Sequence, residues 1–274
     1  VQGQKEIGGI NMLYAALTSK KDSVLPGTEG RLYYLYYDDQ RDARVVDNRP
    51  LFARPQLTDE KLSIHTIGAH VMSLQQFESG SLDALLMGAY QFGDWTNLSH
   101  QAWAIGAETG YQWHKLPLKP WLRAGYFRST GDGDPNDGTH GTFFQVLPTP
   151  RIYARFPFFN AMNNEDAFAQ FRVKPHAKLA LRTDVHHLRL SNARDLWFVG
   201  GGAFQAQTFG FTGRPSSGYQ NLGTLVDLSA DYTLTPTTTL TFYLAGVRGG
   251  DVAKSIYPLG ANSRFTYFEL VKRF

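Results

Sequence analysis

Residues 100–113, His-Gln-Ala-Trp-Ala-Ile-Gly-Ala-Glu-Thr-Gly-Tyr-Gln-Trp, separate apolar from polar side chains by position. One alternate set includes Trp103, Ile105 and Trp113, whereas the other holds only polar or small residues. Because side chains alternate across a strand, the stretch predicts a β-strand with one apolar face. The two tryptophans would lie about 25 Å apart along a membrane normal if the strand is tilted. That spacing suits a membrane-spanning β-barrel, although a strand of a soluble sandwich or lipocalin also alternates.

The composition narrows these choices. The 274-residue chain has no cysteine, which excludes disulfide stapling, thiol catalysis and cysteine metal sites. No apolar run approaches the length of a membrane helix, but a barrel strand needs apolar residues only at alternate positions. The net charge of +3 is too small to imply a nucleic-acid partner, and none is expected. The first residues are neither a methionine nor a signal peptide, as expected for a processed or truncated chain.

The order of strands and connections favours the membrane barrel. Short connections at 114–118, 174–176 and 235–237 alternate with long loops, apart from a brief link at 96–99 on the long-loop side. Outer-membrane barrels have tight periplasmic turns and long outer loops. The long loops are expected at 39–60, 131–163, 191–218 and 250–261. Strands are expected at 5–18, 31–38, 61–74, 81–95, 100–113, 118–130, 164–173, 176–190, 219–233, 237–249 and 262–274.

The carboxyl terminus also favours an outer-membrane barrel. The last strand ends on Phe274, which resembles the aromatic terminal signature of outer-membrane proteins, although Lys272 departs from the alternation. Placing Phe274 on the periplasmic side and counting eleven strands back puts Val1 on the outer side. Bacterial barrels normally have an even strand number and periplasmic termini. Strands preceding Val1 are therefore expected, and a miscount by one strand is the competing interpretation. We treat 1–274 as a single, partial barrel domain.

Charged residues predict the lining of the lumen. In 176–190, Lys178, Arg182 and His186 alternate with apolar residues. A charge at the bilayer centre costs about 2–4 kcal/mol, so this set should face inward. Neighbouring strands add Arg123 and Arg172, and interspersed carboxylates are supplied by Asp166, Asp184, Asp227 and Asp231. The cations could form a track for anions, or the charges could pair across strands, for example Arg182 with Asp166 or Asp227.

Residues 131–138, Gly-Asp-Gly-Asp-Pro-Asn-Asp-Gly, resemble a calcium-binding loop. Asp132, Asp134 and Asn136 have the alternating spacing of oxygen ligands. The glycine falls one position late, and Phe143 stands where the loop would need glutamate, which favours a turn-rich polar loop. Beyond this possible Ca²⁺, no cofactor is expected.

No enzymatic activity is expected. The adjacent residues His186 and His187 should point to opposite faces of their strand, and no serine lies in a nucleophile elbow. The eight histidines show no metal-ligand spacing.

The run from 129 to about 203 is similar to the carboxyl-terminal half of the bacterial alginate export family. The matching pieces are Ser129–Phe143, Asn164-Glu-Asp, Lys174-Pro-His-Ala-Lys-Leu, Asp184-Val-His-His-Leu-Arg-Leu, and Arg194-Asp-Leu-Trp with the glycine triplet. Beyond this run, the weaker resemblance extends to about two thirds of the chain. It implies an outer-membrane barrel of about eighteen strands, of which eleven are visible, and export of an anionic polysaccharide through an arginine-rich lumen.

The expected protein is an all-β, transmembrane, antiparallel up-and-down β-barrel in the outer membrane of a Gram-negative bacterium. Its expected function is passive, electrostatically guided passage of an alginate-like polysaccharide or a smaller anionic solute. The alternative is a structural or binding barrel, plugged by loops 39–60 and 191–218, that docks another component of the cell envelope. Outer-membrane lipid and a periplasmic delivery protein are the expected partners. The substrate-facing candidates are Arg123, Arg172, Lys178, Arg182 and His186.

Overall fold

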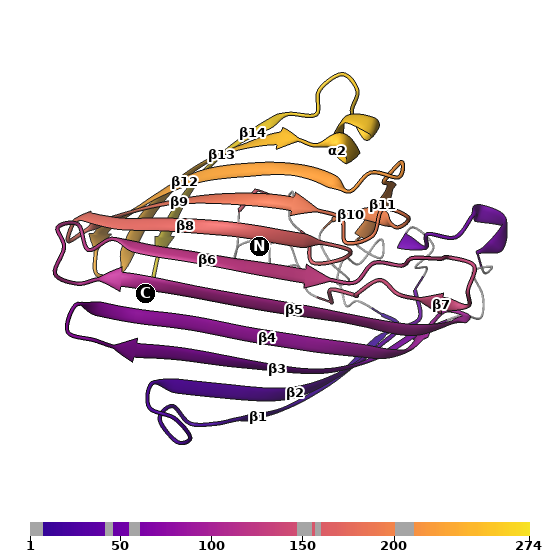
Figure 1. The fold of residues 1–274 in the computed structure, drawn as a ribbon, viewed down its shortest axis with the longest axis horizontal. Helices are drawn as coiled ribbons and strands as arrows, with labels where there is room; N and C mark the ends of the chain where they lie inside the picture. Colours follow the sequence, from indigo (N-terminus) through magenta and orange to yellow (C-terminus); the bar gives the residue numbers. More distant parts are fainter. Residues whose placement is uncertain (1–7, 42–45, 55–60, 147–154, 157–159, 201–210) are drawn as a thin grey trace.

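The computed structural model describes residues 8–41, 46–54, 61–146, 155–156, 160–200 and 211–274. These residues form one long, curved antiparallel sheet, in which the first and last strands bend behind the central ones (Figure 1). Its strands are β1 (Ile10–Thr18), β2 (Thr28–Asp39), β3 (Leu62–Gln76), β4 (Gly80–Trp95), β5 (Leu98–Trp113), β6 (Trp121–Ser129), β8 (Glu165–His176), β9 (Leu179–Arg189), β12 (Asn221–Thr235), β13 (Thr238–Gly249) and β14 (Ser263–Lys272).

Each of these eleven strands pairs with its neighbours in chain order, so the topology is up-and-down. The predicted fold class and the eleven strands are confirmed. Among the described residues, β1 and β14 form the two edges of the sheet. The short strand β7 (Thr139–His140) pairs in parallel with the start of β5. No helix in the described part of the chain is long and apolar enough to cross a membrane.

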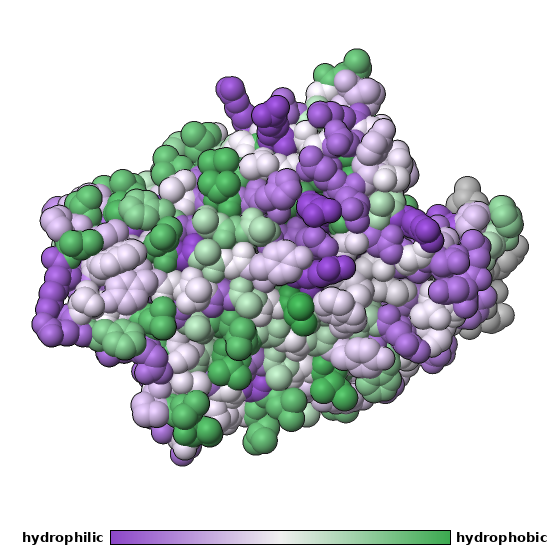
Figure 2. Space-filling model, in the orientation of Figure 1, coloured by the Kyte–Doolittle hydropathy of each residue, from purple (hydrophilic) through white to green (hydrophobic). Residues whose placement is uncertain are grey.

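The outer face of the sheet is apolar, as the alternation predicts. Along β5, Trp103 and Ile105 lie exposed on the outer face, whereas His100 and Glu108 are buried on the inner face. The same alternation continues on β13, where Phe242 and Leu244 lie outside. In Figure 2, hydrophobic side chains spread over the strands, and hydrophilic ones gather over the loop end. An apolar outer face of this kind is what a lipid-embedded sheet requires.

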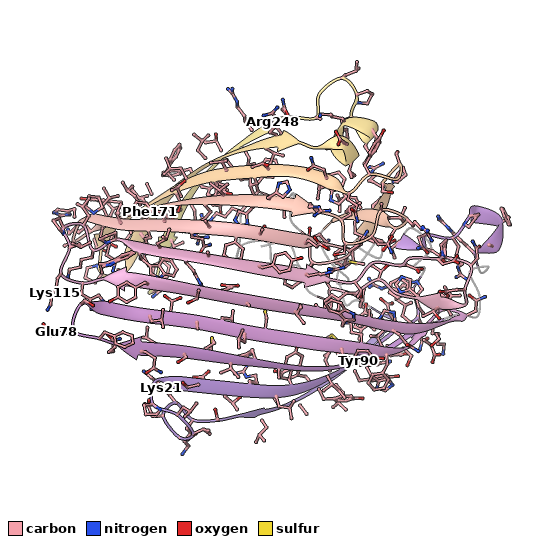
Figure 3. All side chains as sticks on the ribbon, viewed as in Figure 1. Lys21, Glu78, Tyr90, Lys115, Phe171 and Arg248 are labelled. Carbon is pink, nitrogen blue, oxygen red and sulfur yellow. The ribbon has the colours of Figure 1, made fainter. Side chains whose placement is uncertain are left out.

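The ends of the sheet differ in their connections. The tight turns lie at one end, where Glu78 and Lys115 form an ion pair between neighbouring turns (Figure 3). The long loops lie at the other end, together with the two-residue link Thr96–Asn97. We refer to these as the turn end and the loop end. The segregation confirms the expected alternation of short and long connections.

The long loops contain structure that the sequence did not indicate. Loop 191–218 holds a hairpin of β10 (Leu196–Gly200) and β11 (Phe211–Pro215). The other long loops hold a 3-10 turn, η2 (Leu51–Ala53), and a short helix, α2 (Asp251–Ile256). These elements are too short to leave a periodic pattern.

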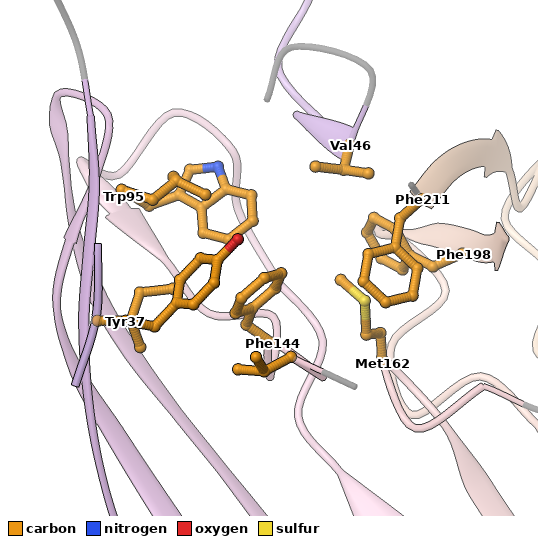
Figure 4. Packing of buried hydrophobic residues seen from close by; sticks show 10 residues of the cluster. Tyr37, Val46, Trp95, Phe144, Met162, Phe198 and Phe211 are labelled. Carbon is orange, nitrogen blue, oxygen red and sulfur yellow. The ribbon is translucent and has the colours of Figure 1, made fainter. Parts of the chain in front are cut away.

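The described parts of the long loops pack against the sheet at its loop end. A hydrophobic cluster joins Tyr37 and Trp95 of the sheet to Phe144, Phe198 and Phe211 of two loops (Figure 4). Both sheet residues are on the inner, concave face and are almost fully buried. The loops therefore fold inward instead of extending away from the sheet.

Candidate functional site: the ionic inner face

Charged side chains cross the inner face of the sheet in its half nearer the turn end. They come from β4, β5, β6, β8, β9, β12 and β14, so the band runs from β4 to β14 and only β13 contributes no charged side chain to it. Its members are Asp83, Glu108, Arg123, Arg172, Arg182, Asp184, Asp227 and Glu269. We call this set the ionic band. Four of the five predicted track residues, all but His186, lie in this half of the sheet.

Arg123 is held between two carboxylates. Its Nη2 lies 2.7 Å from Oε2 of Glu108, and its Nε lies 3.5 Å from Oδ1 of Asp83. The guanidinium lies over the Trp121 ring, 5.5 Å from its centroid, and Trp121 Nε1 donates to Asp83 at 2.6 Å. Gly110 faces this group, where any Cβ would lie 2.7 Å from Trp121 Nε1. The arginine is therefore fixed in position, and two carboxylates offset its charge.

Arg182 pairs within its own strand. Its Nε donates to Oδ1 of Asp184 at 2.9 Å, and its Nη2 donates to the other carboxylate oxygen. Of the two pairings suggested from sequence, the one with Asp166 is wrong, whereas Asp227 does interact electrostatically with Arg182. The register puts Asp166 opposite Leu188, six residues from Arg182 or about 20 Å along the strand. Asp227 also accepts a hydrogen bond from Tyr243 Oη at 2.7 Å.

Arg172 differs from the other arginines of the band. It lies between Trp121 of β6 and Arg182 of β9 in the strand register and is exposed on the inner side. Among the described residues it makes no ion pair or hydrogen bond through its side chain. Lys178, nearer the turn, makes only a 3.5 Å contact to the carbonyl of Leu234. In the described part of the chain, neither cation is paired with a carboxylate.

His186 faces inward but is not accessible. Its Nδ1 lies 2.9 Å from Oδ2 of Asp166, and both side chains are fully buried. The ring also packs near Phe168, with 5.4 Å between ring centroids. The structure therefore brings Arg123, Arg172 and Arg182 to the inner surface and places Lys178 in the turn between β8 and β9. His186 lies in a buried ion pair beneath the inner surface.

The described residues of loop 130–164 contact both β4 and the β13–β14 side of the sheet, at anchors that the sequence did not indicate. Near β4, Gln91 both donates to the carbonyl of Phe144 at 2.8 Å and accepts from its amide at 2.7 Å. On the opposite side, the amides of Arg155 and Phe156 donate to Tyr243 Oη on β13. Arg155 also pairs with Glu269 of β14 at 3.3 Å. This loop therefore narrows the space inside the curved sheet.

In the calcium-like loop, the carboxylates of Asp132 and Asp134 accept hydrogen bonds from other groups of the protein. Asp132 accepts from the amide of Asp134 at 3.2 Å and from Asn48 at 3.0 Å, and Asp134 accepts from the amide of Asn136 at 3.0 Å. In the described part of the chain, no group of three or more acidic or histidine side chains is arranged to hold a metal. Calcium binding by Asp132, Asp134 and Asn136 stays a prediction, which calorimetric titration with CaCl₂ would test.

The buried side chain of Asp195, in the connection after β9, forms hydrogen bonds with this loop. Asp195 Oδ2 accepts from Thr142 Oγ1 at 2.5 Å and from the Asp132 amide at 2.9 Å. Burial raises the pKa of Asp195 from 3.8 to about 7 and also raises the pKa of Asp132. A raised carboxyl pKa means that the folded loops favour the protonated acid. The resulting stabilisation of the folded loops is fully present below about pH 4. It decreases as the pH rises from about 4 and is lost once the pH exceeds about 7.

We therefore expect the opening equilibrium of these loops to rise about tenfold per pH unit between about pH 4 and 7. Hydrogen exchange of the 131–142 amides, corrected for intrinsic rates, would measure it. Asp195→Asn should flatten the dependence, while Asp137→Asn, an exposed position in the same loop, should preserve it. An unchanged slope in Asp195→Asn would contradict the assignment.

The fold and the ionic band together indicate the class of protein. A curved, up-and-down antiparallel sheet with an apolar outer face, an ionic inner face and long loops at one end has the features of an outer-membrane β-barrel. The chain belongs to the alginate export family, whose family model matches residues 12–266. This match extends the predicted resemblance over most of the chain. The family is a transport family, and membership suggests polysaccharide export across the outer membrane. No curated protein matches the chain.

Proposed function

We propose that the ionic band lines a passage through the outer membrane of a Gram-negative bacterium for an anionic polysaccharide, or for a smaller anionic solute. Movement is passive, and no residue takes part in a chemical step. The observation that carries the proposal is Arg172, a cation exposed on the inner side without a partner among the described residues. An uncompensated arginine attracts carboxylates and can bind them bidentately.

The paired members of the band have a second role in this proposal. Arg123 and Arg182 keep their positions through Glu108, Asp83 and Asp184, so each presents a partly neutralised charge to the solute. Conduction requires sites that attract a solute and still release it. An alternation of free and paired cations would both attract and release the solute, because a polyanion could transfer from one weak site to the next. Lys178 extends the series toward the turn end.

Conductance in planar bilayers tests this function. The protein should favour anions over cations, and Arg172→Glu should lower the anion-to-cation permeability ratio by a factor of about three or more, since the local charge changes by two. Arg264→Glu makes the same change on the outer face of β14 and serves as the matched control. Equal effects of the two substitutions, or a cation-selective parent protein, would refute the proposal.

One observation supports the alternative of a plugged barrel. The hydrophobic cluster that includes Phe144, Met162, Phe198 and Phe211 fills inner space at the loop end with loop side chains. A protein that stays silent in bilayers at all voltages, while remaining folded, would favour a structural or docking role. Measurable solute flux would favour the passage. A periplasmic delivery partner would act at the turn end in either case.

A further inference from the structure

The outer face of the sheet changes its chemistry around its loop end. Over β2–β5 the rim is aromatic: His65 lies between Tyr36 and Phe92, with ring centroids 4.8 and 5.1 Å away. Outward positions of four later strands, β6, β9, β13 and β14, carry arginines instead, namely Arg128, Arg189, Arg248 and Arg264. On a lipid-facing surface, an arginine is tolerated near the interface and costly at the midplane. These arginines therefore mark the depth of the lipid headgroups.

Two of these arginines are organised by a carboxylate between them. Arg128, Glu165 and Arg189 are directly opposite one another on β6, β8 and β9. Glu165 Oε1 lies 3.4 Å from Arg128 Nε, and its Oε2 lies 4.0 Å from Arg189 Nη1. The triad keeps a net positive charge, and both arginine side chains are more than two-fifths exposed. The guanidinium of Arg128 also lies 5.9 Å from the Trp103 ring centroid.

An apolar hollow of about 420 Å³ adjoins this triad. Its outward walls are Val71, Leu86, Ile105 and Tyr126, and its floor is formed where the outward residues are small: Ala69, Gly88 and Ala107. Ile105 is directly opposite Arg128 in the register, and Ala107 is opposite Tyr126. The hollow therefore begins at β6, the strand that carries Arg128, and extends across the outer face of β5, β4 and β3.

We propose that this surface binds one phosphorylated acyl lipid of the outer leaflet. An acyl chain would lie in the hollow, and the phosphate would contact Arg128 and Arg189. We infer a lipid because the arginines and the apolar hollow lie side by side. In a phosphorylated lipid, the phosphate and the acyl chain likewise meet at the boundary between headgroup and hydrocarbon. Arginine matches phosphate geometry through paired N–H donors. The inference concerns the lipid-facing side and does not depend on which solute crosses the inner face.

Native mass spectrometry of the detergent-solubilised protein tests this site, with lipid A carrying two phosphates as the probe. Arg128→Gln should weaken binding at least about tenfold, the contribution of a charge-assisted hydrogen bond. Arg264→Gln removes an outward cation far from the hollow and should change binding less than threefold, about the effect of long-range charge alone. Lipid A without phosphates should bind at least about tenfold more weakly, and millimolar inorganic phosphate should not displace the intact lipid.

The hollow is tested separately by filling it. A Cβ at Gly88 would have only ordinary contacts, with nothing closer than 3.7 Å, so Gly88→Leu should fold and occupy the groove. Gly246, on the outer face of β13, has no atom within 4 Å of its Cβ position and gives the matched control Gly246→Leu. We expect a loss of lipid binding in Gly88→Leu alone. Equal binding by both leucine variants, or equal losses in Arg128→Gln and Arg264→Gln, would overturn the proposal, whatever the bilayer conductance shows.

Discussion

Replacing His186 with alanine is expected to lower the free energy of unfolding by about 3–5 kcal/mol, as breaking a buried ion pair does. The substitution leaves Asp166 without its 2.9 Å partner at a site where both side chains are fully buried. The Asp166 Oδ1 atom already has no hydrogen-bond partner, so the carboxyl group would lose its last one. Urea titrations of the protein folded in detergent micelles or vesicles would measure the difference.

His187 provides the control, because it follows His186 directly and is exposed on the opposite face of β9. His187→Ala removes the same side chain without uncovering a buried charge and should change stability by no more than about 0.5 kcal/mol. The double variant Asp166→Leu/His186→Phe should recover most of the loss, since an apolar pair can replace a buried ion pair. Equal stabilities of His186→Ala and His187→Ala would show that the pair contributes nothing.

The second large effect is expected at Gln91. Leucine at this position would remove both hydrogen bonds to the Phe144 backbone, and each buried group left without a partner costs about 1–3 kcal/mol. The loop would then lose its anchor on β4, while its contacts with Tyr243 and Glu269 remain. We expect larger single-channel conductance and faster hydrogen exchange at residues 143–146.

Gln101→Leu is the matched control for this loop. Gln101 lies on the outer, exposed face of β5 and is opposite Phe92 in the register, so it does not touch the loop. Its replacement should leave conductance and exchange unchanged. If Gln91→Leu conducts like the parent protein although its loop exchanges faster, the loop does not limit the passage, and the narrowing must lie elsewhere.

Much of the fold could be predicted from the sequence because membrane strands follow a local rule. Alternation along 100–113 predicted which side chains face outward, and Trp103 and Ile105 are indeed exposed on the outer face. The same reasoning placed His186 and His187 on opposite faces and located the long loops at one end. Such properties depend on residues two positions apart, so a single strand carries all the information needed.

The tertiary structure decided which charges meet and where the loops lie. Sequence offered Asp166 and Asp227 as partners of Arg182. In the structure Asp166 pairs with His186, and Arg182 forms its ion pair with Asp184 and interacts electrostatically with Asp227. Likewise, nothing near Gln91 in the chain indicates Phe144, which is 53 residues away. Contacts of this kind depend on strand register and on loop packing across the concave face, and neither leaves a periodic trace in the sequence.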